Sequence, residues 1–120
     1  MKTTSQRTDM TAFNYVVFVP NANQVKFGFT RNIKRRVAEH RRMAVRAGFG
    51  DIRWSAMAST DAVARLTETS LRKGMRSGVV HGHLEWVAGD IETYRAVIMA
   101  TRRIQKQVQA LFAGEFHAAA

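Results

Sequence analysis

The stretch YVVFVPNANQVKFGFTRNIKRRVAEH, residues 15–40, decides the expected fold. Residues 13–19 are mostly β-branched and aromatic, which predicts a strand buried on both faces. Residues 20–23, PNAN, are turn formers, and residues 24–29 alternate, so a second strand and a hairpin follow. In that strand Lys26 and Gly28 share a face, and the missing side chain of Gly28 leaves room for something to approach the backbone.

A basic helix is predicted after the hairpin. Thr30 or Asn32 caps it, and it runs to about Arg46 before it stops at Gly48. Arg36 and His40 lie one helical turn apart on it. Basic side chains cover much of the rest of its surface: Lys34, Arg35, Arg36, Arg41, Arg42 and Arg46. Glu39 is the only acidic residue among them, which favours phosphate contact over simple solvation.

The next predicted elements are a strand over residues 51–57 and a helix over residues 61–76, capped by Ser59 or Thr60. The expected inner stripe of that helix is Ala64, Glu68, Leu71 and Met75. Glu68 is the misfit, because a carboxylate is costly to bury unless it is paired, hydrogen-bonded or bound to a cation. Glu68 is therefore the first acidic residue to suspect of function.

The remainder of the chain predicts a short extended segment at residues 83–87 and a long final helix over residues 90–112. The one-sided apolar series of that helix suits packing across the sheet or against a second copy, so a monomer and a homodimer remain equally open. Residues 1–12 and 114–120 are expected to be tails around one domain, residues 13–113. The expected fold class is α+β: a small three-stranded, mainly antiparallel sheet flanked by three helices.

Charge is the strongest global feature. The chain of 120 residues carries 19 Lys and Arg against 9 Asp and Glu, a formal net charge of +10. Such a surplus favours a polyanionic partner, and its concentration on one helix favours nucleic acid over an anionic membrane surface or mere solubility. Cysteine is absent, which excludes disulfides and thiolate metal sites and suits a reducing cytoplasm. No apolar run approaches the ~20 residues needed to cross a bilayer.

The histidine pair and the two tryptophans are better explained by structural or surface roles than by catalysis. His81 and His83 lie in a glycine-rich loop without a third ligand at a familiar spacing, which favours a surface or DNA-facing role over a metal site. Trp54 and Trp86 are expected in the core or at a sheet edge. No nucleophilic triad, P-loop or dinucleotide fingerprint is present.

The motifs in this order resemble the GIY-YIG nuclease superfamily, especially its short bacteriophage-type branch with K-I-G as the second motif. The first motif is represented by Tyr15 alone, the second by residues 26–30, KFGFT, and the helix motif by residues 32–40, NIKRRVAEH. Glu68 corresponds to the family's metal-binding glutamate inside a helix, and residues 85–87, EWV, resemble the phage-branch E-W-F element. The resemblance covers roughly residues 13–90.

The resemblance implies metal-assisted hydrolysis of a phosphodiester bond in DNA, by a phage or mobile-element endonuclease in a bacterial or phage-infected cytoplasm. One divalent ion, Mg²⁺ or Mn²⁺, would be held by Glu68. The implied catalytic residues are Tyr15, Lys26, Arg36, His40 and Glu68. The expected phosphate- and DNA-binding residues are Gly28, Thr30, Lys34, Arg35, Arg41, Arg42 and Arg46.

Lys26 stands where many family members have the tyrosine assigned as the general base. A lysine free in water has a pKa of about 10.4, so it acts as a base only where the site depresses that pKa. Otherwise it binds phosphate and leaves Tyr15 or His40 to move the proton, His40 having the better-placed intrinsic pKa. Structurally neutral readings also exist: Tyr15 and Lys26 as ordinary strand residues, and Glu68 paired with Arg35, Arg36 or Arg65.

Two alternatives to the nuclease remain open at this stage. One is a nucleic-acid-binding module that kept the fold and lost catalysis, with Lys26 as the mark of that loss. The other is a phage-encoded interaction protein that uses its basic face to engage an acidic host protein. The sequence leaves open whether a DNA substrate is single-stranded, duplex or branched.

Overall fold

The computed structural model describes residues 10–75, 79–80 and 83–119, with side chains described outside residues 79–80, 83–85 and 114–119. Its elements, in chain order, are β1 (Ala12–Val19), the 3₁₀ turn η1 (Pro20–Ala22), β2 (Gln24–Thr30), α2 (Ile33–Arg46), β3 (Arg53–Ser59), α3 (Asp61–Gly74), β4 (Val79–Val80), β5 (His83–Ala88) and α4 (Ile91–Ala119). The predicted α+β class and the three α-helices are confirmed for the described residues.

The sheet is larger than the three strands predicted from the sequence. Its order among the described residues is β3-β1-β2-β5-β4, with four substantial antiparallel strands and the two-residue β4 at one edge. The segment predicted only as extended is β5, which pairs with β2 through Lys26 and Trp86. Because β5 takes up the hydrogen-bonding edge of β2, the hairpin is internal to the sheet.

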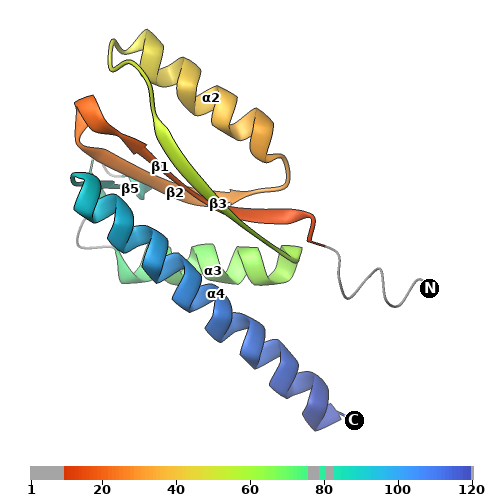
Figure 1. Ribbon diagram of the computed structural model, residues 1–120. Helices are drawn as coiled ribbons and strands as arrows, with labels where there is room; N and C mark the ends of the chain where they lie inside the picture. The colour runs from red at the N-terminus through yellow and green to blue at the C-terminus, as the bar shows by residue number, and fades with distance from the viewer. Residues whose placement is uncertain (1–9, 76–78, 81–82, 120) are drawn as a thin grey trace.

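Alternation along the strands separates two faces of this sheet. On β1, Val16 and Phe18 point toward α3 and α4, whereas Tyr15 and Val17 point toward α2. Figure 1 shows α2 covering one face of the sheet and α3 with α4 covering the other. We call these the α2 face and the α3/α4 face.

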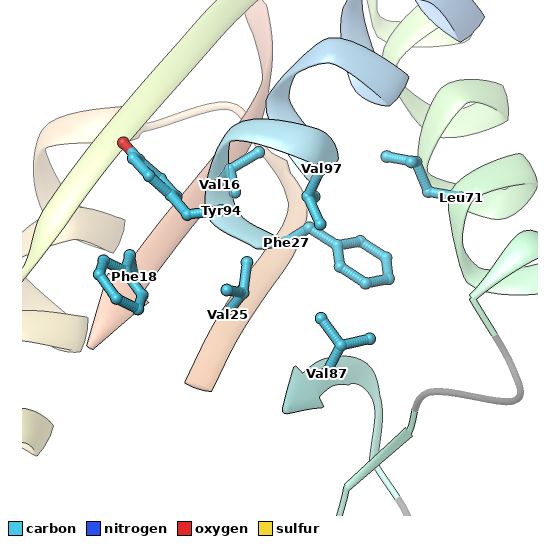
Figure 2. Close-up of a cluster of buried hydrophobic side chains, with 8 residues drawn as sticks. All are labelled: Val16, Phe18, Val25, Phe27, Leu71, Val87, Tyr94 and Val97. Carbon is cyan, nitrogen blue, oxygen red and sulfur yellow. The ribbon is translucent and has the colours of Figure 1, made fainter. Parts of the chain in front are cut away.

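The larger apolar cluster lies on the α3/α4 face. Figure 2 shows Phe27 of β2 lying between Val16, Val97, Leu71 and Val87. Phe18 and Tyr94 stack with ring centroids 5.6 Å apart. The strands, α3 and α4 thus share one closed core.

Side-chain caps fix where the helices begin. They also decide between the two candidate capping residues that the sequence offered for α2 and for α3. Asn32 caps α2 by accepting a hydrogen bond from the backbone N–H of Arg35 at 3.1 Å, and Thr60 caps α3 by accepting from Val63. Asp90 caps α4 in the same way, accepting from Glu92 and Thr93.

Two sequence-based expectations about α3 and α4 need correction. The buried residues of α3 are Val63, Ala64, Thr67 and Leu71. The inner stripe is therefore rotated, and Glu68 sits at its edge with 15% of its side chain exposed. The helix α4 continues to Ala119, beyond the expected end at residue 112, so most of the expected C-terminal tail is helical. The expected N-terminal tail falls almost wholly outside the described residues.

A buried polar contact ties β1 to both helices of the α3/α4 face. The Asn14 side chain donates to the carbonyl of Ala64 at 2.9 Å and accepts from Gln105 at 3.1 Å. Asn14 is fully buried, so these partners satisfy an amide that would otherwise be costly to enclose. They also fix where α3 and α4 cross the sheet.

Candidate active site

Tyr15 and Arg36 meet on the α2 face. Tyr15 comes from the middle of β1 and is only 2% exposed, and Arg36 comes from the first half of α2. Nη1 of Arg36 donates to the Tyr15 hydroxyl oxygen at 3.4 Å, and the guanidinium lies 5.9 Å from the centre of the phenol ring. The α2 helix thus presents a charged group at the hydroxyl end of a buried ring.

Glu39 holds the other side of the same guanidinium. Its carboxylate lies 3.1 Å from Nε of Arg36 and 3.7 Å from Nε of Arg35, at the i+3 and i+4 positions of one helix. In the sequence, Glu39 stands out only as the single acidic residue on a basic helix. The spacing from residue 36 to residue 39 was the signal that would have identified it as the orienting partner of Arg36.

Gly28 lies directly beside the phenol ring of Tyr15. It is the cross-strand partner of Tyr15, and a Cβ atom at Gly28 would lie 2.5 Å from the Tyr15 hydroxyl and 2.7 Å from its ring carbon Cζ. The space left by the missing side chain is occupied by the phenol ring. The glycine therefore makes room for Tyr15, and a role of this residue in phosphate access stays a prediction.

Lys26 and His40 form the second half of the cluster. Nζ of Lys26 lies 3.4 Å from Nδ1 of His40 and 4.1 Å from the centre of the Trp86 indole, a cation–π distance. The His40 ring is 5.3 Å from that of Tyr15. Side chains from β1, β2, α2 and β5 thus meet around one point. Trp86 belongs to this site, although the sequence placed it only in the core or at a sheet edge.

The charge state of His40 follows from its surroundings. Burial, then the charges of Lys26 and Arg36, lower the pKa of His40 from 6.5 to about 4. The imidazole is therefore neutral at pH 7 and a weak proton acceptor. This departs from the sequence-based expectation that His40 has the better-placed pKa for moving the proton.

Glu68 comes from the helix α3. Its helix α3 packs against the α3/α4 face, and its carboxylate lies 2.8 Å from Nη2 of Arg72. The structural partner among the arginines is thus Arg72, one turn along the same helix, while Arg65 pairs with Asp61 at 2.8 Å and Arg36 with Glu39. On the α2 face, Tyr15 contacts Arg36 and His40, and His40 contacts Lys26.

The expected DNA-contacting residues divide into two groups. Five lie on the solvent side of α2 and are exposed: Lys34, Arg35, Arg41, Arg42 and Arg46. Three of these arginines, with Ala38 and Val45, line a groove of about 380 Å³. Thr30 differs, because it is 6% exposed and its hydroxyl bonds the backbone of Asn32 at the entry to α2.

The described residues also bear on metal and membrane binding. No three of their His, Asp or Glu side chains converge as a ready-made metal cluster. None of the helices in the described part of the chain combines the length and apolar character needed to span a bilayer. The His81 and His83 side chains lie outside the described portion.

Comparison with models of known protein families gives a match. Residues 12–109 match the T5orf172 domain, a phage-associated domain of the nuclease type, which suggests a nuclease-like or DNA-binding function. Neither curated proteins nor solved structures give a match. The matched region begins at the first residue of β1 and ends within α4, so it includes every residue of the cluster described above. The chain therefore belongs to the T5orf172 domain family.

Proposed function

We propose that this protein is a divalent-metal-dependent endonuclease of the GIY-YIG type that hydrolyses phosphodiester bonds in DNA. The observation that carries the proposal is the meeting of Tyr15, Lys26, Arg36 and His40 on one face of the sheet. These residues come from β1, β2 and α2. In addition, the family is of a nuclease type and the net charge is +10.

Arg36 supplies charge for the phosphate. Its guanidinium is held by Glu39 through Nε and by Tyr15 through Nη1, so its orientation is fixed before any substrate arrives. A pre-oriented guanidinium can donate to the non-bridging oxygens of a phosphate and stabilises the charge that develops there.

Tyr15 and Lys26 are the groups that handle the proton or the phosphate. A phenol that accepts a hydrogen bond from a guanidinium can still donate its own proton to an oxygen of the reacting phosphate. Lys26 is fixed between His40 and Trp86 and can act as a second cationic contact or as the base. His40, with its pKa of about 4, acts in this proposal by positioning Lys26.

Glu68 suits the role of the metal-holding carboxylate by its donor chemistry. Mg²⁺ binds through one or two carboxylates together with water and substrate phosphates, and Glu68 is a partly exposed carboxylate of that kind. The bound ion would stabilise the leaving oxygen and the negative charge on the phosphate. The ion pair with Arg72 holds the carboxylate in place until then.

The deciding experiment is a cleavage assay on single-stranded and duplex DNA with Mn²⁺, Mg²⁺ or EDTA. We expect metal-dependent cleavage that falls by about 10²- to 10³-fold in Arg36→Ala, the loss typical of removing one electrostatic contact to the reacting group. Glu68→Ala should fall at least as far, and Glu68→Asp should require more Mn²⁺ than the wild type.

Matched controls are present in the chain. Arg102 is an exposed arginine on α4, and Glu92 forms an ion pair with Arg95 much as Glu68 does with Arg72. Arg102→Ala and Glu92→Ala should both cleave at the wild-type rate. Full activity in both Arg36→Ala and Glu68→Ala would remove the mechanism.

The second candidate function is binding of nucleic acid without cleavage. The groove between Arg41, Arg42 and Arg46 favours it, because it lies on the outside of α2 and can contact a phosphate backbone without using the cluster. This function predicts steeply salt-dependent DNA binding that is indifferent to EDTA, and no product with any metal.

A further inference from the structure

A cavity adjoins the cluster at the other end of the hairpin. It has a volume of about 190 Å³ and lies between the second half of α2, the ends of β1 and β2 next to the turn, and β5. Its lining residues are Val19, Gln24, His40, Met43, Ala44, Ala47, Phe49 and Trp86. Met43 and Ala47 are exposed, so the cavity opens beside them.

The walls combine flat apolar surfaces with few polar groups. Trp86 and Phe49 supply aromatic surface, Met43 and Ala44 supply aliphatic surface, and Gln24 supplies an amide. A cavity of about 150 Å³ in another protein accommodates benzene, so this one has room for a somewhat larger flat ring. Aromatic walls with an amide at the edge are the features by which proteins hold an unstacked base.

His40 adds an unsatisfied donor to the same walls. Its Nε2 is buried and has no hydrogen-bond partner among the described residues. When Lys26 is an ammonium it can only donate, so Nδ1 of His40 then accepts from it and the proton of the neutral ring lies on Nε2. A buried N–H without an acceptor is costly, so a ligand acceptor that reached Nε2 from the cavity would relieve that cost.

We propose that this cavity receives a nucleobase rotated out of its stack, next to the phosphate held by Lys26 and Arg36. The inference rests on the proposed function, since it places a DNA strand on the α2 face. A base is favoured over other flat ligands because His40 and Trp86 line the cavity and also contact Lys26, which joins the apolar cavity to a cationic site. The exposed arginines on the outside of α2 can hold the neighbouring phosphates.

The test separates base binding from phosphate binding without any cleavage. Binding of the full-length chain is measured in EDTA to a thymidine 12-mer and to a 12-mer of abasic residues with the same number of phosphates. The wild type should bind the thymidine strand at least about fivefold more tightly, because stacking on an aromatic side chain contributes that much per base.

Two variants change the cavity without changing the cationic contacts. Ala47→Phe fills the opening from an exposed position, and Gln24→Leu removes the amide at nearly constant size. Ala47→Phe should reduce the preference for the thymidine strand to about onefold, and Gln24→Leu should reduce it in part because the aromatic walls remain, while affinity for the abasic strand stays unchanged in both. Ala96→Phe, at an exposed site on α4, should keep the wild-type preference.

Each outcome has a distinct meaning. If the wild type binds neither strand, the proposed function fails and this inference fails with it. If it binds both strands equally, the cavity takes no base, while cleavage of DNA remains tenable. A preference retained in both Ala47→Phe and Gln24→Leu would place base contacts elsewhere and overturn the inference. Circular dichroism establishes that each variant is folded, and either cavity variant alone decides if the other does not fold.

Discussion

The two faces of the sheet are constructed from the same strands but differ in what they enclose. On the α3/α4 face, Val16, Phe27 and their neighbours form a continuous apolar cluster, and the buried polar side chains there are amides and hydroxyls such as Asn14 and Thr67. On the α2 face, apolar residues share the layer with Lys26, Arg36 and His40. The difference teaches that the α3/α4 face supplies the larger apolar core, whereas the α2 face holds the cluster of Lys26, Arg36 and His40.

The alternation of each strand makes this division possible. Phe27 and Lys26 are consecutive on β2 and point to opposite faces, so the apolar side of the strand anchors the polar side. The cationic cluster is held by a strand that cannot move without disrupting the opposite core. This arrangement suits a site that must be in place before substrate binds.

The largest expected effect lies on the α3/α4 face. Phe27→Ala should lower the free energy of unfolding by about 3–5 kcal/mol, because the ring is fully buried and the change leaves a cavity. Phe29→Ala, at a partly exposed ring on the same strand, is the control and should cost clearly less. Urea denaturation of both variants measures the difference. Equal losses would show that the burial of the Phe27 ring does not determine the cost of its removal.

Acid should act first on the α2 face. The pKa of His40 is lowered from 6.5 to about 4 in the folded protein, so the unfolded chain binds more protons between those values. The free energy of unfolding is therefore unaffected by protonation of His40 above pH 6.5. As the pH falls from 6.5 towards 4, protonation of His40 in the unfolded chain lowers that free energy by up to roughly 3 kcal/mol.

Urea denaturation at several pH values tests this effect, with His40→Gln as the variant that should lack it. Hydrogen exchange should show α2 opening before α3 and α4 as the pH falls. Exchange that increases at the same rate on both faces would contradict the assignment of the acid sensitivity to His40.

The smallest expected effect compares two glycines. Gly28→Ala should cost about 1–3 kcal/mol, because the new methyl group collides with the Tyr15 ring. It should also reduce cleavage by displacing the hydroxyl from Arg36. Gly74→Ala, where no atom lies within 4 Å of the new Cβ, should be neutral or stabilise α3 by about 0.5–1 kcal/mol. Thermal melts of both variants measure the contrast, and an unchanged Gly28→Ala would mean that Tyr15 does not depend on this glycine.

The sequence predicted most strands and helices because their formation depends on residues that are close together in the chain. The hairpin, the basic surface of α2 and the pairs of candidate caps, Thr30 or Asn32 and Ser59 or Thr60, all follow from residues a few positions apart. The motif order predicted that Arg36 and His40 lie one turn apart on α2. It also predicted that both residues approach Tyr15. The roles of these side chains in cleavage remain predictions.

The parts that could not be predicted depend on contacts between distant residues. The pairing of β5 with β2 brings Trp86 to Lys26 across sixty residues of chain, and nothing local to either strand specifies that partner. The rotation of the α3 stripe, which moves Glu68 to the edge, is set by how α3 meets the sheet and α4. The sequence pattern alone allowed either side of α3 to face inward, with Glu68 in the centre of the buried stripe or at its edge.

What the sequence by itself determined is the first three strands, the three α-helices, the cationic surplus on one helix and the set of polar residues near the hairpin. Periodicity, turn chemistry and capping are local, so they can be read along the chain. Only the tertiary structure decided that Gly28 accommodates Tyr15, that Glu39 orients Arg36 and that His40 is neutral beside a cavity. Burial and charge proximity are properties of the folded arrangement, since they arise when separate strands and helices exclude water together.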